Sequence, residues 1–284
     1  MKKRNLYTST DIEHSYRRIG EHKRSRHIIL RHSYNPADVR SVALEGLPLK
    51  RMRTVLDLGC GYGYFTEHLG GLLAGDPHIV GIDLVESNRE AFLETLDSIG
   101  CRGEFHAGNS ESIRNMESAR FDLVIASYSL YFFPHLIGEI ARITKPGGIF
   151  VAITHSRHSL KEIMKFIPDC MERAGIERPD EMAINRLFDA FSLENGESLL
   201  RPHFKQVEML PFPNYLTFSP SEIDSFIEYL RGKEFLIMKD VLDRFPGKID
   251  EVRNCFYKKI LEKSLQDSGI RVTKDDGIFR CYRH

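Results

Sequence analysis

Short apolar runs bounded by turn residues recur along the first half of the chain. They are TVLDLG (54–59), HIVGIDL (78–84), GEFHAG (103–108), FDLVIAS (121–127) and GIFVAIT (148–154). Runs of this length are typical of parallel strands that are buried on both faces. We therefore expect five parallel strands between residues 54 and 154.

Stretches long enough for helices separate these strands, at 64–73, 87–99 and 133–144. Ser87 and Asn88 can cap the second helix and Gly100 can end it, because these residue types favour helix termini. Strands that alternate with helices indicate an open sheet with right-handed crossovers. Two later strands are expected, at 206–210 and, as an edge strand, at 277–282. The predicted fold class is α/β, a doubly wound, mostly parallel seven-stranded sheet with helices on both faces.

The flanking segments predict further helices that form a helical cap. One N-terminal helix is expected over 11–30 and a second after Asn35-Pro36-Ala37-Asp38, with Asn35 as its cap. Later helices are expected at 160–174, 179–191, 194–200, 222–230 and 248–265. We divide the chain into an N-terminal helical cap segment (1–53), a Rossmann-like core (54–154), and lid insertions with the last two strands (155–284).

Composition narrows the class of protein. With 42% hydrophobic and 28% charged residues, the chain matches an ordinary globular protein, and no apolar stretch approaches the roughly 20 residues that span a bilayer. The basic start MKKRNL is not followed by the apolar run of a secretory signal. Five cysteines without a C-x-x-C pair favour reduced thiols and no metal site. We expect a cytoplasmic protein, a monomer or homodimer, with no membrane association.

Charge is distributed unevenly, although the formal net charge is zero. Residues 1–53 hold thirteen Lys and Arg against five Asp and Glu, so the remainder is correspondingly acidic. Such a segment can attract an anionic substrate or nucleic acid, or it can be a helical arm whose charges face water.

The segment VLDLGCGYGYF (55–65) is the main candidate for ligand binding. Gly59, Gly61 and Gly63 follow the first strand and precede a helix, where a backbone without side chains can approach a ligand closely. The third glycine of a dinucleotide-binding G-x-G-x-x-G motif is replaced by Tyr64, whose bulk opposes the approach of a pyrophosphate. A ligand without phosphates therefore fits this turn better.

Asp57 with these glycines resembles the first motif, Asp-x-Gly-x-Gly-x-Gly, of the class I S-adenosylmethionine-dependent methyltransferases. The resemblance covers about residues 50–156. It implies that the turn holds the methionine part of S-adenosyl-L-methionine, with Asp57 near the amino group, and that S-adenosyl-L-homocysteine is the product.

The same resemblance assigns further cofactor contacts. Asp83, 24 residues after Gly59, ends the second strand, where a carboxylate can accept hydrogen bonds from both ribose hydroxyls. Leu84 would pack on the adenine, and Asn109, Ser110 and Glu111 would lie at its edge. Strand four ends at Ser127, and the loop after it would expose its side chains beside the sulfonium.

Catalysis and substrate selection are assigned to residues around this site. His155, just past strand five, is the first candidate for a general base, ahead of His135 and His158, and Tyr128 and Tyr131 are candidate positioning groups. The implied reaction moves a methyl group to an O or N atom of a small molecule. A flat or anionic acceptor is suggested by the basic and aromatic residues Tyr16, Arg17, Arg18, Phe212, Tyr215 and Phe218.

Three alternatives remain at this point. The chain could methylate RNA or protein through its basic segment, although SYSLYFFP stands where base-modifying relatives carry a tetrapeptide with two prolines and an aromatic residue. It could bind S-adenosylmethionine without catalysis. It could also be a nicotinamide-dependent oxidoreductase.

Overall fold

The computed structural model describes residues 7–284. The basic start MKKRNL, from which no secretory signal was expected, lies outside the described residues, and so do its Lys2, Lys3 and Arg4. The chain divides into two compact units. The sheet unit comprises Ala37–Ser156, Asp189–Phe212 and Asp276–His284. The helical unit comprises the residues up to Pro36, Arg157–Phe188 and Pro213–Asp275. The sequence-based division placed its boundaries after residues 53 and 154.

A seven-stranded sheet forms the centre of the sheet unit, in the order β3-β2-β1-β4-β5-β9-β6. Its strands are β1 (Thr54–Leu58), β2 (His78–Asp83), β3 (Arg102–Ala107), β4 (Phe121–Ser127), β5 (Thr144–His155), β6 (Gln206–Phe212) and β9 (Asp276–Tyr282). All neighbouring pairs are parallel except the two pairs that β9 makes with β5 and β6. The predicted mostly parallel seven-stranded sheet is confirmed.

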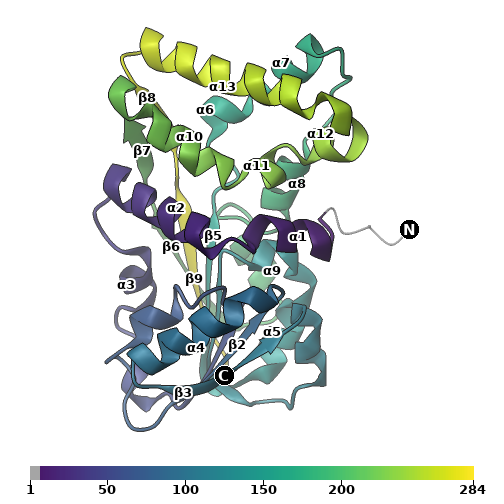
Figure 1. Cartoon of the computed structure of the whole chain (residues 1–284). Coiled ribbons are helices and arrows are strands. Elements are labelled where there is room, and N and C mark those ends of the chain that lie inside the picture. The colour runs from purple at the N-terminus through teal and green to yellow at the C-terminus, as the bar shows by residue number, and fades with distance from the viewer. Residues whose placement is uncertain (1–6) are drawn as a thin grey trace. The chain divides into compact units, whose positions relative to one another are not determined.

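The position of β9 differs from the prediction of an edge strand. It pairs with β5 on one side and β6 on the other, and Figure 1 shows it in yellow between them. Ile278, Phe279 and Cys281 are fully buried, which an edge with one open side would not achieve. The prediction was wrong because position at the end of the chain does not determine position in a sheet.

Helices pack on both faces of this sheet, as predicted. On one face Val39 and Leu44 of α3 (Val39–Leu44) and Phe92 of α4 (Arg89–Ser98) join a core with Ile149 and Val151 of β5. Phe150 between them faces the other side, because successive strand residues alternate, and it stacks on Phe204. Helices α5 (Ile137–Ile143) and α9 (Gly196–Leu200) complete the unit.

Two local predictions in the sheet unit were wrong. The stretch 64–73 forms only a 3-10 helix, Thr66–Leu69, because the glycine turn extends to Gly63 and Gly70 ends the helix. Asp38, not Asn35, caps the helix that follows, and its carboxylate accepts from the backbone N–H of Arg40. Asn35 instead bonds to Asn214 and Pro213.

The helical unit contains most of the remaining helices. Their bounds are α1 (Ser9–Tyr16), α2 (Ile19–His32), α6 (Lys161–Met164), α7 (Phe166–Arg173), α8 (Ala183–Ala190), α10 (Ile223–Arg231), α11 (Glu234–Ile237), α12 (Lys239–Arg244) and α13 (Ile249–Gln266). A two-stranded antiparallel sheet, β7 (Tyr215–Phe218) with β8 (Ile270–Thr273), was not expected from the sequence. The helix expected at 222–230 is preceded by a capping box between Ser219 and Glu222.

Two cysteines of the helical unit are paired. Cys170 of α7 and Cys255 of α13 form a disulfide, with Cα atoms 5.6 Å apart. The prediction of five reduced thiols was therefore wrong for this pair, since residues 85 positions apart in sequence meet only after the two helices pack. Cys60, Cys101 and Cys281 are free thiols. Over residues 7–284, no helix has both the length and the apolar character needed to cross a membrane.

Candidate functional site

The glycine turn after β1 adopts a backbone that only glycines adopt readily. Gly59, Gly61 and Gly63 have φ angles of 72°, 52° and 90°. A Cβ on Gly59 would lie 2.5 Å from Cβ of Ser129, and one on Gly63 would lie 2.9 Å from the side chain of Thr95. A Cβ on Gly61 would meet nothing within 4 Å. Gly59 and Gly63 are thus required for packing, whereas Gly61 borders open space in which a ligand can approach the backbone.

Asp57 is buried beneath this turn, with 1% of its surface exposed. Its Oδ2 accepts a hydrogen bond of 2.7 Å from Thr66 Oγ1, while Oδ1 is buried and has no partner among the described residues. Burial, and secondarily the charge of Asp83, raises the pKa of Asp57 to about 7. A cationic ligand beside Asp57 would supply the positive counter-charge that the protein itself does not provide to this carboxylate among the described residues.

Asp83 connects the end of β2 to the glycine turn. Its Oδ2 accepts from the backbone N–H of Gly61 at 2.8 Å, and its Oδ1 accepts from the N–H of Val85 at 2.8 Å and from Asn88 at 3.1 Å. Burial raises the pKa of Asp83 despite these bonds. The carboxylate therefore orders the loop, and the ribose contact expected of it stays a prediction. Leu84, the next residue, is half-buried.

The third predicted element follows β3 at the same edge of the sheet. The N–H of Gly108 donates to the carbonyl of Asp83 at 2.9 Å, which brings the next residues beside the second strand. Asn109 caps the 3-10 helix Ser110–Asn115 through an Oδ1 that accepts from the N–H of Glu111 at 3.1 Å. Glu111 pairs with Arg114 and His135. These side chains have structural partners, so adenine recognition here stays a prediction.

The loop after β4 is held in a strained conformation. Tyr128 has a φ of 55°, which is costly for a residue with a bulky side chain. Its N–H bonds to the carbonyl of Ile153, and Ser129 Oγ donates to the carbonyl of Leu58 at 2.6 Å. The Oγ of Ser127 is buried and has no partner within residues 7–284. Strain and an unsatisfied hydroxyl in one loop are typical of functional sites.

Two of the predicted catalytic residues contact one carboxylate, and the third, Tyr131, packs beside them. Asp276, which begins β9, accepts from Tyr128 Oη at 2.8 Å and lies 2.8 Å from Nδ1 of His155. The imidazole of His155 packs against the rings of Tyr128 and Tyr131, with centroid distances of 4.7 and 6.1 Å. Burial and Asp276 raise the pKa of Tyr128 well above its usual value, so the phenol stays protonated. A carboxylate at Nδ1 fixes the proton there and leaves the basic lone pair on Nε2.

Asp276 is 3% exposed and was missed by sequence reasoning. It lies 121 positions from His155, and their register pairing in β5 and β9 brings them opposite one another. The only local signal is a pair of aspartates, Asp275 and Asp276, before a strand. Asp275 has another role, because it accepts from the N–H of Asn214.

Arg40 is a second residue that the sequence did not single out. It is 5% exposed, donates to the carbonyl of Tyr64 at 2.6 Å and lies over the Tyr64 ring at 4.2 Å. Asp38 and Glu67 supply its carboxylate partners. Arg40 thus holds the C-terminal side of the glycine turn in place.

Other basic residues of the N-terminal segment also have acidic partners. Arg18 pairs with Glu21, Arg24 with Glu228, and Arg31 lies 3.9 Å from Glu222. These arginine side chains are exposed, so the pairs are typical of a solvated helical surface. This arrangement favours the arm whose charges face water over a nucleic-acid grip.

The predicted acceptor-selecting aromatics do not form one group. Phe212 ends β6 in the core of the sheet unit, whereas Tyr215 and Phe218 belong to the helical unit. Phe218 is fully buried between His32 and Phe226, and Tyr215 stacks on Tyr34 under Arg271. They act as packing residues here. Among residues 7–284 no cluster of His, Cys, Asp and Glu could hold a metal ion.

The geometry at the β1, β2 and β4 ends fits S-adenosylmethionine, the cofactor that the resemblance implies. The buried Asp57 and the half-buried Asp83, both with raised pKa values, suit a ligand that carries a sulfonium and an ammonium group. The unpartnered atoms Asp57 Oδ1 and Ser127 Oγ and the open approach at Gly61 offer further contacts. The residues present therefore fit the group.

Comparisons with known proteins agree with this fit. A family model described as a methyltransferase domain matches residues 55–148. The demethylmenaquinone methyltransferase of Lactococcus lactis is 32% identical over 192 residues, which cover 57% of this chain and 76% of that protein. The ubiquinone biosynthesis O-methyltransferase of Maricaulis maris is 30% identical over 115 residues, 39% of this chain and 44% of the relative.

Among solved structures, the [4+2]-cyclase SpnF superposes with a TM-score of 0.55 at 17% identity and covers 97% of both chains. That likeness concerns the fold alone. The chain spans only about two fifths to half the length of the first curated relatives that it matches.

Proposed function

Since the chain belongs to the Rossmann-like, S-adenosylmethionine-dependent methyltransferases, we propose that it transfers the methyl group of this cofactor to an O or N atom of a small molecule. The observation that carries the proposal is the contact of His155 and Tyr128 with Asp276 beside the glycine turn's sheet edge. An inert binding protein would not need a histidine oriented by a buried carboxylate. The two curated relatives named above, one of them an O-methyltransferase, support a small-molecule acceptor.

Cofactor binding is assigned to the acidic residues of the site and to the glycine turn. Asp57 would neutralise cationic charge, Asp83 would accept from the ribose, and Gly61 would allow the backbone to approach the ligand. When bound, S-adenosylmethionine supplies an electrophilic methyl group whose leaving group is a neutral thioether. Most of the acceleration then comes from aligning the acceptor with that methyl group.

The proton of the acceptor is assigned to His155. An acceptor hydroxyl or ammonium group loses its proton to Nε2, while Asp276 stabilises the imidazolium that forms through its bond to Nδ1. Tyr128 donates to the second oxygen of Asp276 and keeps that carboxylate oriented. Tyr131 supports the imidazole ring from its face.

A thermal-shift panel tests the cofactor. S-adenosylhomocysteine at 100 times its dissociation constant should stabilise the protein by about 2.7 kcal/mol, and NAD and NADP should have no effect. A shift with NAD but none with S-adenosylhomocysteine would overturn the assignment. Transfer of a radiolabelled methyl group to phenolic or amine acceptors, with the His155→Gln variant as control, then tests the activity.

The cellular location is part of the proposal. Composition favours the cytoplasm, while a disulfide such as Cys170–Cys255 is rare there. The number of free thiols, counted in protein freshly isolated under alkylating conditions, distinguishes an oxidising location from the cytoplasm. Three free thiols support the disulfide, and five support a reduced cytoplasmic form.

A further inference from the structure

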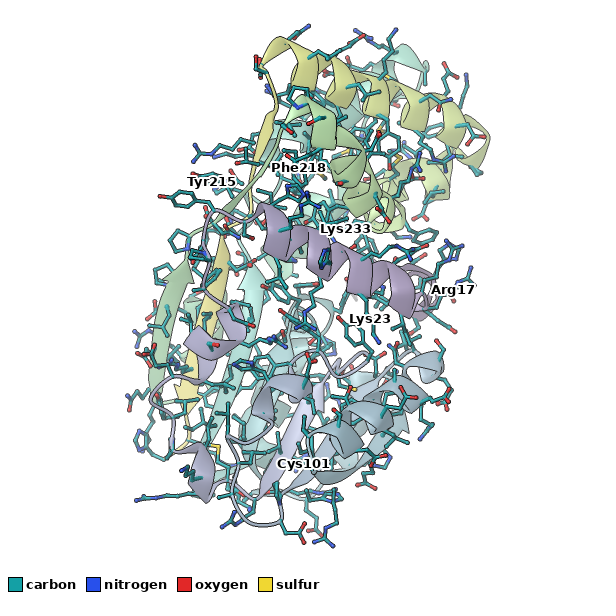
Figure 2. The ribbon with its side chains drawn as sticks, turned by 60° about the vertical axis from the view of Figure 1, so that its left-hand side comes forward. Arg17, Lys23, Cys101, Tyr215, Phe218 and Lys233 are labelled. Carbon is teal, nitrogen blue, oxygen red and sulfur yellow. A yellow bond between two sulfur atoms is a disulfide. The ribbon has the colours of Figure 1, made fainter. Side chains whose placement is uncertain are left out.

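The residue before Asp276 is also an aspartate, and its carboxylate has a fixed partner. Asp275 Oδ1 accepts a hydrogen bond of 2.8 Å from the backbone N–H of Asn214. The chain passes from the helical unit to the sheet unit between Asp275 and Asp276. Tyr215, which follows Asn214 and begins β7, marks this segment in Figure 2. The bond therefore holds the backbone one residue before the carboxylate that contacts His155.

Asp276 is the first residue of β9, so its backbone is held by the sheet on one side only. The ladders of β9 with β5 and β6 hold the chain from Asp276 onward. Its carboxylate must nevertheless stay within 2.8 Å of both Tyr128 Oη and His155 Nδ1. Ends of ordered segments fray unless the chain beyond them is held. The backbone before Asp276 therefore needs an anchor outside the seven-stranded sheet.

Asn214 is a rigid partner for Asp275. It is 6% exposed, its Oδ1 accepts from the N–H of Asn35 at 3.0 Å, and its Nδ2 donates to Ser33 Oγ at 3.0 Å. Its carbonyl also accepts from the N–H of Lys274 at 3.0 Å. A buried side chain whose oxygen and nitrogen both have partners is held in one orientation. Asn214 thus offers Asp275 a donor of fixed position.

A second carboxylate bonds to the same stretch of chain, farther from His155 in sequence than Asp275 is from Asp276. Glu162 of α6 accepts from the N–H of Thr273 at 2.9 Å and from its Oγ1 at 2.6 Å. Thr273 ends β8 and also pairs with Tyr215 in the β7–β8 ladder. Loss of Glu162 leaves Thr273 in that ladder, whereas Asp275 belongs to neither β8 nor β9. Glu162 is therefore the matched control for Asp275.

We propose that Asp275 is a positioning residue for methyl transfer. Its bond to Asn214 fixes the start of β9, and the fixed backbone holds the carboxylate of Asp276 against His155. Asp275 acts through Asp276 and not on the reacting atoms. The inference rests on the proposed function, because it assigns Asp275 to the general base of that reaction.

The tautomer of His155 is the direct test, because it needs no methyl transfer. Nitrogen-15 NMR of histidine-labelled protein distinguishes a protonated ring nitrogen from one with a lone pair, and the His155 signals are assigned by their loss in His155→Gln. In the native protein at alkaline pH, Nδ1 should carry the proton, because Asp276 accepts it. In Asp275→Ala this preference should be lost, and both tautomers should be populated.

Two variants separate positioning from a general loosening of the chain. Asp275→Asn retains an oxygen that accepts from the N–H of Asn214, so it should keep the native tautomer. Glu162→Ala should keep it as well. A native tautomer in Asp275→Ala overturns the inference, and so does a mixture of tautomers in Asp275→Asn or in Glu162→Ala.

A further variant covers the case in which Asp275→Ala does not fold. Asp275→Val also lacks the acceptor, and its β-branched side chain favours extended backbone. It should show the same mixture of tautomers. Failure of both variants to fold would mean that Asp275 serves folding alone, which overturns the inference.

Steady-state kinetics gives a second measurement. Asp275→Ala should lower kcat about 10-fold to 100-fold, while KM for the acceptor and the affinity for S-adenosylhomocysteine are retained. Asp275→Asn should restore kcat to within about threefold of the native value, since a neutral acceptor is weaker than a charged one. A change in KM alone would overturn the positioning role. If the native protein keeps the proton of His155 on Nδ1 but methylates no acceptor, the proposed function fails and the contact set by Asp275 stands.

Discussion

The two units treat a buried charge differently. In the sheet unit Asp57 is 1% exposed, its pKa is raised, and no basic side chain among the described residues pairs with it. In the helical unit Lys239 is 4% exposed and contacts both Asp11 and Asp243. A buried charge is unfavourable unless a group of opposite sign is near, so the comparison indicates a cationic ligand at the glycine turn and a structural role for Lys239.

Charges with structural roles are treated differently in both units. Arg40 of the sheet unit is held by Asp38, and Lys239 of the helical unit by Asp11 and Asp243. Pairing within the chain thus accompanies these structural charges, whereas Asp57 at the candidate site has no basic partner among the described residues.

The largest expected effect compares His155 of the sheet unit, which contacts Asp276, with the half-buried His22 of the helical unit, which has no carboxylate contact among the described residues. His155→Gln should lower kcat by about 10²- to 10⁴-fold, since general base catalysis contributes that much. His22→Gln should leave kcat within about threefold. Steady-state kinetics on a small-molecule acceptor measures both. Equal kcat values for His155→Gln and the native protein would remove His155 from the mechanism.

The second prediction concerns Asp83, with the exposed Lys258 as control. Asp83→Ala should weaken S-adenosylhomocysteine at least about 100-fold, because it removes the proposed ribose acceptor and releases the N–H of Gly61. It should also destabilise the free protein by about 1–3 kcal/mol, since three hydrogen bonds to the carboxylate are lost. Lys258→Gln should leave this affinity unchanged, because its side chain is 76% exposed. Calorimetric titration of both variants is the measurement, and native affinity in Asp83→Ala would remove Asp83 from the cofactor site.

The third prediction compares a buried lysine with an exposed one. At pH 7, Lys239→Met should destabilise the protein by about 2 kcal/mol, because Asp11 and Asp243 lose their partner. Lys258→Met on α13 should change the stability by less than about 0.5 kcal/mol, because its side chain is 76% exposed and a surface ion pair contributes little. Urea unfolding measures both variants, and equal changes would mean that the pairing of Lys239 has no structural role.

The fourth prediction uses the pKa of Asp57, which burial raises to about 7. An acid whose folded pKa is raised stabilises the fold at low pH, and this contribution is lost as pH rises from about 4 to 7. Asp57→Asn should therefore stabilise the free protein at pH 8 by about 1–2 kcal/mol and have little effect at pH 4.

Cofactor affinity should change in the opposite direction. Because a cationic ligand favours ionised Asp57, S-adenosylmethionine should bind more tightly as pH rises from 5 to 7, by at most about tenfold per pH unit, and then level off. In Asp57→Asn this dependence should disappear. A flat profile in the native protein would show that Asp57 is already ionised.

Much of the fold and half of the site were predictable from the sequence. Buried parallel strands appear as continuous apolar runs, and a glycine turn at a strand end is local, so Gly61, Asp57 and Asp83 could be identified from neighbouring residues. His155 could be nominated because it follows a strand of known direction. The prediction of helix caps was less reliable, because Asp38 and not Asn35 caps α3 in the folded chain.

What the sequence by itself determined is thus the part that depends on short-range order: the strand–helix alternation, the acidic glycine turn and the nomination of His155. Only the tertiary structure decided the insertion of β9 between β5 and β6, the contact of Asp276 with His155, the Cys170–Cys255 disulfide and the contact of Lys239 with Asp11. Each of these depends on residues far apart in the chain, and their contacts follow from packing and register. No local pattern records which carboxylate will meet which base.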